Sequence, residues 1–232
     1  MKIGFDLISD LFLDPNDSFN WEGKATSLYC LISGNISNDL RTIEQTLAHL
    51  SRFYHAIFYT PGFLEYKDIE DVYSRTADIS MICNNHKGVT MLHHHVVIVD
   101  GIAIVGSNGW YGIDDSFGLL EKAQSEVYRY EDLAYLQATI EKLQMHLDVK
   151  KILVLSSSVP NIKLYFGEHP NSAIDQISLD VTLSSDTQKK IAIWAFGTYE
   201  KIVDTQIDGI HYFCNPYLKI RPYWPKRVEI IV

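Results

Sequence analysis

Short apolar runs rich in β-branched side chains alternate with amphipathic segments along the chain. Runs of this length, bounded by turn-forming residues, predict buried β-strands. The turn pair Asp100-Gly101 between two such runs predicts a tight hairpin. Strands that alternate with helices are typical of a layered α/β domain. The predicted strands cover residues 2–8, 27–32, 56–59, 96–99, 103–105, 152–155, 191–195 and 209–213.

Two further segments have the apolar spacing of helices. Leucine and isoleucine recur every three or four positions over residues 40–50, after a predicted N-cap at Ser37 or Asn38. A second stripe, over residues 125–147, predicts the longest helix, with Leu147 as the last residue of its apolar face. Both helices are expected to pack against the sheet of their own domain.

Composition limits the classes of protein to which the chain can belong. Its 232 residues, 47% of them hydrophobic, are enough for one substantial core, so we expect one globular domain over residues 1–232. The formal net charge of −9, without a dense lysine or arginine block, argues against non-specific nucleic-acid binding.

Cysteine usage and hydropathy bear on localisation. The three cysteines are far apart and form no Cys-x-x-Cys pair, which indicates free thiols in a reducing compartment. The chain has neither a signal-like start nor an apolar run long enough for a membrane span. We therefore expect a soluble cytoplasmic protein without membrane contact.

The ends of several predicted strands resemble the calcineurin-like metallophosphoesterase family. Residues 9–12, Ser-Asp-Leu-Phe, resemble the family's Ser-Asp-Leu-His, and residues 34–35, Gly-Asn, resemble its Gly-Asp. Residues 62–65, Gly-Phe-Leu-Glu, resemble its Gly-Asn-His-Glu. Residues 152–160 resemble the strand that ends in a ligand histidine, and residues 191–200 resemble the segment that ends in Gly-His-Thr-His. The resemblance covers essentially the whole chain in the family's order.

The resemblance implies a fold and a set of site positions. The fold is a four-layer αββα sandwich, in which helices flank two mixed sheets. Seven positions would hold two divalent cations, and position 64 would carry the histidine that assists the leaving group. In this chain the degenerate site positions hold Asp10, Phe12, Asn35, Phe63, Leu64, Ser157, Thr198 and Glu200. Of these, Asp10 alone is identical to the family residue.

The replacements differ in their chemical consequences. Asn35 has lost the negative charge with which an aspartate bridges two cations. Phe12 and Phe63 cannot coordinate a metal, and we expect their rings to fill the former metal cavity. Leu64 cannot transfer a proton. The sequence therefore predicts a pseudoenzyme with no catalytic residue, metal or cofactor.

A phosphoesterase-like scaffold that has lost its catalytic residues can still act by binding a partner. We expect the chain to bind another protein or to serve as a subunit of a larger assembly. A phage assembly is one example. Two alternatives stay open. Asp10, Asn35 and Glu200 could form a weak all-oxygen site for one Mg²⁺ or Ca²⁺ in a reduced phosphodiesterase. The old cleft could instead bind a nucleotide or another phosphate ligand, which would call for lysine or arginine at the strand ends.

A run of three histidines, at positions 93–95, has the composition of a metal-binding tract. Successive side chains of a strand point to opposite faces, so the sequence predicts that His94 points away from His93 and His95. This arrangement favours a surface run over a metal site.

Overall fold

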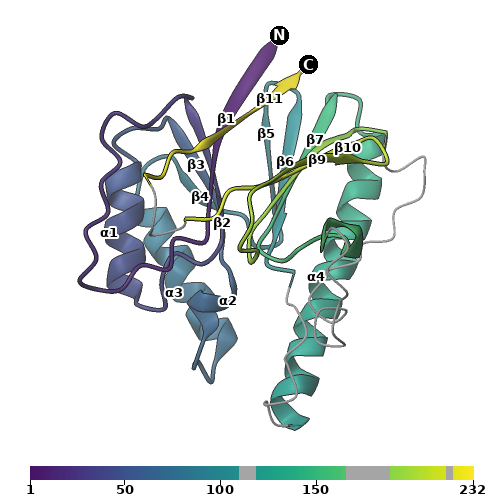
Figure 1. Cartoon of the computed structure of the whole chain (residues 1–232). Helices are drawn as coiled ribbons and strands as arrows, with labels where there is room; N and C mark the ends of the chain where they lie inside the picture. The colour runs from purple at the N-terminus through teal and green to yellow at the C-terminus, as the bar shows by residue number, and fades with distance from the viewer. Residues whose placement is uncertain (110–118, 166–188, 218–221) are drawn as a thin grey trace.

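The computed structural model describes the chain except for residues 110–118, 166–188 and 218–221. Its described strands form two sheets (Figure 1). The first sheet has the order β11-β1-β2-β3-β4, in which β11 is antiparallel to β1 and the other strands are parallel. Its strands are β1 (Lys2–Ser9), β2 (Tyr29–Ser33), β3 (Ala56–Thr60), β4 (Val89–Met91) and β11 (Lys226–Ile231).

The second sheet has the order β5-β6-β7-β8-β10-β9. Its four central strands are parallel, and β5 and β9 run antiparallel at its edges. Its strands are β5 (His95–Val99), β6 (Ile102–Ser107), β7 (Lys151–Ser156), β8 (Ile191–Phe196), β9 (Val203–Ile207) and β10 (Ile210–Cys214). The predicted hairpin joins β5 to β6, and Asp100 and Gly101 both have the positive φ of a tight hairpin turn.

Helices cover the outer faces of both sheets (Figure 1). The first sheet carries α1 (Leu40–Leu50) and α3 (Val72–Asn85), with the short α2 (Phe63–Tyr66) beside them. The second sheet carries α4 (Leu119–Met145), and a 3₁₀ turn spans Ile162–Tyr165. The layers follow the order helix, sheet, sheet, helix, so the predicted four-layer αββα sandwich is confirmed.

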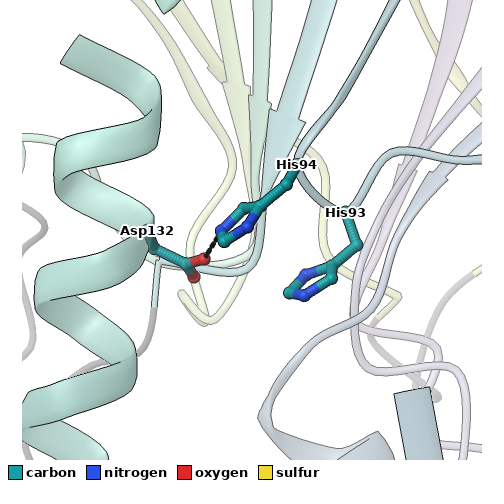
Figure 2. A group of neighbouring side chains, drawn as sticks. All are labelled: His93, His94 and Asp132. Carbon is teal, nitrogen blue, oxygen red and sulfur yellow. Dashed lines mark hydrogen bonds and ion pairs between the residues drawn. The ribbon is translucent and has the colours of Figure 1, made fainter. Parts of the chain in front are cut away.

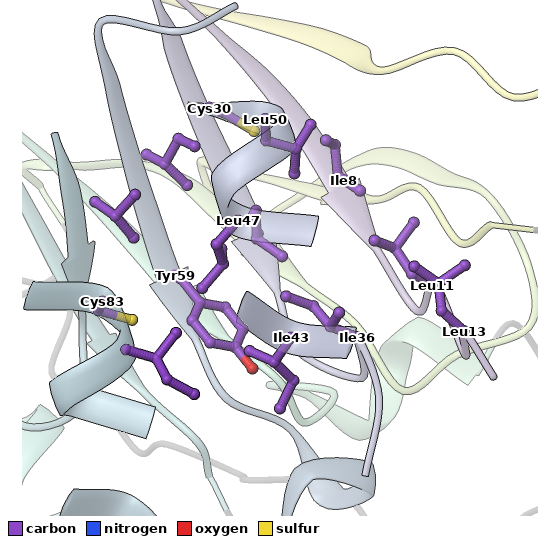
Figure 3. Close-up of a cluster of buried hydrophobic side chains, with 14 of the residues drawn as sticks. Ile8, Leu11, Leu13, Cys30, Ile36, Ile43, Leu47, Leu50, Tyr59 and Cys83 are labelled. Atoms are coloured by element: carbon purple, nitrogen blue, oxygen red, sulfur yellow. The ribbon is translucent and has the colours of Figure 1, made fainter. Parts of the chain in front are cut away.

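The hydrophobic core lies in three layers because each sheet buries both of its faces. Phe5 and Leu7 of β1 meet Leu153 and Leu155 of β7 between the two sheets. Their neighbours along the strands point outward to the helices, as the two-residue period of a strand requires. The cluster between the first sheet and its helices includes Ile8 and the apolar stripe of α1 (Figure 3).

The structure corrects several predicted boundaries. The N-cap of α1 is Asp39, whose carboxylate accepts a hydrogen bond from the Thr42 N–H, and not Ser37 or Asn38. Leu147 lies beyond the end of α4 and is 86% exposed, so it is not part of the buried stripe. Strands β4, β9 and β11 and helix α3 were not predicted.

Candidate functional site

Parallel strands of both sheets end at one edge of the sandwich. Ser9 of β1 lies opposite Ser33 of β2, so the residues that follow these strands lie side by side. Ser156 of β7 lies opposite Phe196 of β8 in the second sheet. The Ser33 hydroxyl donates a hydrogen bond to the Ser156 carbonyl and thereby joins the two sheets directly below this edge.

Glycines allow the loops at this edge to approach one another closely. A Cβ atom on Gly34 would lie 2.5 Å from Ser157 Oγ and 2.8 Å from Gly62 Cα. A Cβ on Gly62 would lie 2.5 Å from Asn35 Oδ1. All three distances are shorter than the contacts that real Cβ atoms make, so a larger residue at either position would push the loops apart.

Asn35 lies at the centre of this edge. Its Nδ2 donates hydrogen bonds to Asp10 Oδ1 at 2.7 Å and to Thr198 Oγ1 at 3.1 Å. Its Oδ1 accepts a hydrogen bond from the Leu64 backbone N–H at 2.9 Å. Because that acceptor faces a backbone donor, the amide orientation is fixed and the NH₂ group must point at Asp10 and Thr198.

Two further hydrogen bonds complete the group. The Thr198 backbone N–H donates to Asp10 Oδ1 at 2.8 Å. The hydroxyls of Ser157 and Thr198 lie 3.2 Å apart and share a hydrogen bond. We call Asp10, Asn35, Ser157 and Thr198 the strand-end cluster. The structure thus brings together four of the eight site positions considered in the sequence.

The backbone at this edge is held in an unusual conformation. Asp10, Phe12, Asn35 and Thr198 have φ values of 54°, 46°, 58° and 53°. Aspartate and asparagine adopt the left-handed region with little strain, whereas a β-branched threonine rarely does. Such outliers concentrate at sites where a fold aims particular side chains.

Asp10 is 2% exposed. Its Oδ2 atom is buried and has no hydrogen-bond partner within the described residues. Burial raises the pKa of this carboxyl to about 7, although the hydrogen bonds from Asn35 and Thr198 act in the opposite direction. A proton therefore resides on Asp10 for much of the time at neutral pH.

Glu65, in α2, is a further residue of the site, and the sequence did not indicate its role. It is fully buried, and its carboxylate accepts hydrogen bonds from the backbone N–H groups of Asn35, Ile36 and Gly62. Its Oε1 also accepts from the Tyr59 hydroxyl at 2.9 Å. Glu65 therefore holds the loop after β2 against the loop after β3. Its place at the end of the Gly-Phe-Leu-Glu segment was the one available signal.

The remaining site positions are not members of the cluster. Phe12 is 47% exposed, so the prediction that its ring fills the former metal cavity is wrong. Asp10 and Phe12, in the loop after β1, both have a positive φ, so the alternation of side chains along the strand does not continue to Phe12. Phe63 and Leu64 are half-buried at the start of α2, and Glu200 is exposed. We call Phe12, Phe63 and Leu64 the apolar rim.

The backbone places the apolar rim next to the strand-end cluster. The Phe12 N–H donates to the Asn35 carbonyl at 2.9 Å, and the Leu64 N–H donates to the Asn35 side chain. Neither the cluster nor the rim includes a lysine or an arginine. The nearby Arg75 uses its guanidinium to donate to the backbone carbonyls of Glu65 and Asn38.

Two solved structures share the fold of this chain. The phosphopantetheinyl hydrolase of Mycobacterium tuberculosis superposes with a TM-score of 0.70 and 16% identity, over 98% of this chain and 96% of that one. The "Putative 5'-Nucleotidase" of Staphylococcus aureus, solved with alpha-ketoglutarate, gives a TM-score of 0.60 and 10% identity, over 99% of this chain and 51% of that one. The chain therefore has a metallophosphoesterase-like fold.

Sequence comparison is less informative. No family model matches the chain. Uncharacterized protein L509 of Acanthamoeba polyphaga mimivirus is 25% identical over 120 residues, which are 50% of this chain. The match spans 40% of that relative's own length. Within the described part of the chain, no helix is both long and apolar enough to cross a bilayer.

Proposed function

We propose that this chain is a non-catalytic member of the metallophosphoesterase fold that binds another protein at the apolar rim. The observation that carries the proposal is the pair of hydrogen bonds from the Asn35 amide to Asp10 and Thr198. In a working two-metal site, the corresponding side chains direct lone pairs at cations between them. In this chain an N–H group occupies that direction.

The donor set does not fit the two divalent cations that the fold family implies. An amide hydrogen directed at Asp10 Oδ1 repels a cation from the same space, and the Leu64 N–H prevents the amide from turning round. Ser157 and Thr198 offer neutral hydroxyls that are hydrogen-bonded to each other, and neutral hydroxyls are poor ligands for transition metals. The exposed Glu200 is not among the hydrogen-bonded residues of the cluster.

The apolar rim supports a protein as the partner. Aromatic and aliphatic side chains that surround a site commonly anchor protein interfaces. A phosphate ligand would instead need cationic groups, and Arg75 is already committed to backbone carbonyls. The mimivirus relative supports a viral setting for such an assembly.

Catalysis is tested with purified, tag-free protein and a generic aryl phosphodiester in the presence of Mn²⁺, Zn²⁺, Mg²⁺ or Ni²⁺. We expect no turnover above that of Asp10→Asn, a nearly isosteric variant that keeps the oxygen facing Asn35. Metal-dependent turnover by the wild type that Asp10→Asn abolishes would refute the proposal and favour the reduced phosphodiesterase.

Partner binding is tested by co-purification of the tagged chain from its native source, followed by crosslinking of the captured protein. Phe12→Ala should lose the partner while the chain remains folded. Ile98→Ala is the matched control, because Ile98 is an apolar side chain of similar exposure, 49%, on β5 and away from the rim. Equal capture by both variants would exclude the apolar rim as the interface. Release of the partner by inorganic phosphate would favour a phosphate ligand in the old cleft.

A further inference from the structure

A second group of polar side chains shares no residue with the strand-end cluster. His93 and His94 belong to the connection between β4 and β5, and Asp132 projects from α4 (Figure 2). One potential ligand atom of each residue lies within 4.8 Å of the other two. The group therefore joins a connection from the first sheet to the helix that covers the second.

The predicted separation of His93 and His94 is wrong. Strand β5 begins only at His95, and His94 has a φ of 50°. This left-handed residue breaks the alternation expected of a strand, so the two rings stack with their centroids 4.5 Å apart and their planes 11° apart. His95, by contrast, is exposed on the strand.

The three side chains are held in place by different means. His94 Nε2 and Asp132 Oδ1 lie 2.5 Å apart, and the ring of Tyr135 stacks on His94 with centroids 4.5 Å apart. Asp132 is 1% exposed, and its Oδ2 accepts a hydrogen bond from the Gly109 N–H at 2.6 Å. Carboxylates that bind a metal are themselves commonly oriented by hydrogen bonds of this kind.

His93 supplies an independent indication of a missing ligand. Its Nδ1 atom is buried and has no hydrogen-bond partner within the described ranges. Buried polar atoms are nearly always paired, because an unpaired one loses its hydration without compensation. A bound ion between His93, His94 and Asp132 would give the imidazole a partner.

We propose that His93, His94 and Asp132 form a binding site for one divalent transition metal ion of the zinc class. Two imidazoles and a carboxylate are typical ligands of Zn²⁺ and Co²⁺, whereas Mg²⁺ and Ca²⁺ prefer oxygen alone. Three protein ligands leave a fourth position for water or an external group.

The geometry requires small movements only. Ligand atoms about 2.0–2.2 Å from a tetrahedral ion lie roughly 3.3 Å from one another. The His94–Asp132 contact of 2.5 Å would open, and the wider separations, up to 4.8 Å, would close. The side chain of His94 is 34% exposed, which gives an ion a path to the site.

The site is tested by titrating tag-free, metal-stripped protein with Co²⁺ and following the visible absorption of a four-coordinate ion. We expect saturation at one equivalent. His94→Gln and Asp132→Asn should each weaken binding by more than about 100-fold, beyond the usual loss for an outer-shell partner. His95→Gln is the matched control from the same histidine run and should bind as the wild type does. Circular dichroism checks that each variant is folded.

Three results would overturn the proposal. The first is the absence of saturable Co²⁺ binding by the wild type. The second is loss of binding in His95→Gln, which would assign the ion to the exposed run. The third is loss of binding in Asp10→Asn, which would assign the ion to the strand-end cluster and would also contradict the proposed function. If Asp132→Asn does not fold, Co²⁺ binding by His94→Gln tests the proposal alone, because the partly exposed His94 ring is easier to replace than the buried Asp132.

Discussion

Asp10→Asn should change how the stability of the chain depends on pH. The carboxyl of Asp10 has an ordinary pKa of 3.8 when the chain is unfolded and a pKa of about 7 when it is folded. A raised pKa in the folded state means that folding favours the protonated form. The contribution of Asp10 to stability is therefore full below pH 3.8, and it is lost as the pH rises through 7.

The magnitude follows from the same two values. Each pKa unit corresponds to about 1.4 kcal/mol, so a fully ionised Asp10 costs roughly 4 kcal/mol in the folded state. Between pH 5 and pH 8 the wild type should lose about 3 kcal/mol of unfolding free energy relative to Asp10→Asn. The variant keeps an oxygen toward Asn35 and tolerates the positive φ at this position. Its buried NH₂ group adds a cost that does not vary with pH.

Urea unfolding of both proteins at pH 5, 6, 7 and 8, followed by tryptophan fluorescence, measures this difference. Parallel pH profiles would refute the reasoning, because they would mean that Asp10 is ionised and compensated in the folded state. If the profiles became parallel only when Mn²⁺ is added, a cation would be binding beside Asp10, against the proposed function. Asp6→Asn is the control on the same strand. Asp6 accepts hydrogen bonds from two backbone N–H groups and two hydroxyls, so an amide there should cost about 2–3 kcal/mol.

Three further predictions concern the same edge of the sandwich. Phe12→Ala should lower the free energy of unfolding in urea by less than about 1 kcal/mol, whereas Ala in place of the fully buried Phe196 should lower it by about 3–5 kcal/mol. Equal losses would place the Phe12 ring in the core. Glu65→Gln should cost about 2–4 kcal/mol because an NH₂ group would face backbone donors, whereas the exposed Glu200→Gln should stay within about 0.5 kcal/mol. In a His94→Gln background, restoration of the family's ligands should create stoichiometric Mn²⁺ binding, which elemental analysis measures. A folded variant that binds no metal would show that these positions do not correspond to the family's ligand positions. That variant combines Phe12→His, Asn35→Asp, Phe63→Asn, Leu64→His, Ser157→His, Thr198→His and Glu200→His.

The layered architecture could be predicted because buried strands and amphipathic helices carry strong periodic signals. The eight predicted strands all lie within or beside strands of the structure. Helix α3 was missed because only four of its fourteen residues are buried, so its apolar stripe is faint. Strand β4 has three residues, too few for alternation to be recognised. Strand β11 alternates charged and apolar residues and pairs with β1 from the opposite end of the chain, which local sequence does not indicate.

The site was harder to predict because its side chains follow the ends of strands. The alternation rule applies within a strand and fails at the first left-handed residue after it. After β1, Asp10 and Phe12 are both left-handed, and the Phe12 ring lies outside the cluster. After β4, His94 is left-handed, and its ring stacks on His93. The hydrogen bonds of Asn35 depend on the Leu64 backbone, and a residue pattern does not reveal how an amide is turned.

The two polar groups differ in whether a cation can replace the proton between their side chains. The Asn35 amide keeps both of its hydrogens at any pH that a folded protein survives, so its contacts with Asp10 and Thr198 cannot become metal bonds. An imidazole has a neutral form with a lone pair on one nitrogen, so the hydrogen bond between His94 and Asp132 can give way to an ion that binds both. The Asn35→Asp change removes this obstacle in the strand-end cluster and leaves the His94 group unaltered. Comparison of the metal content of these two variants, Asn35→Asp and His94→Gln, therefore tests the two proposals separately.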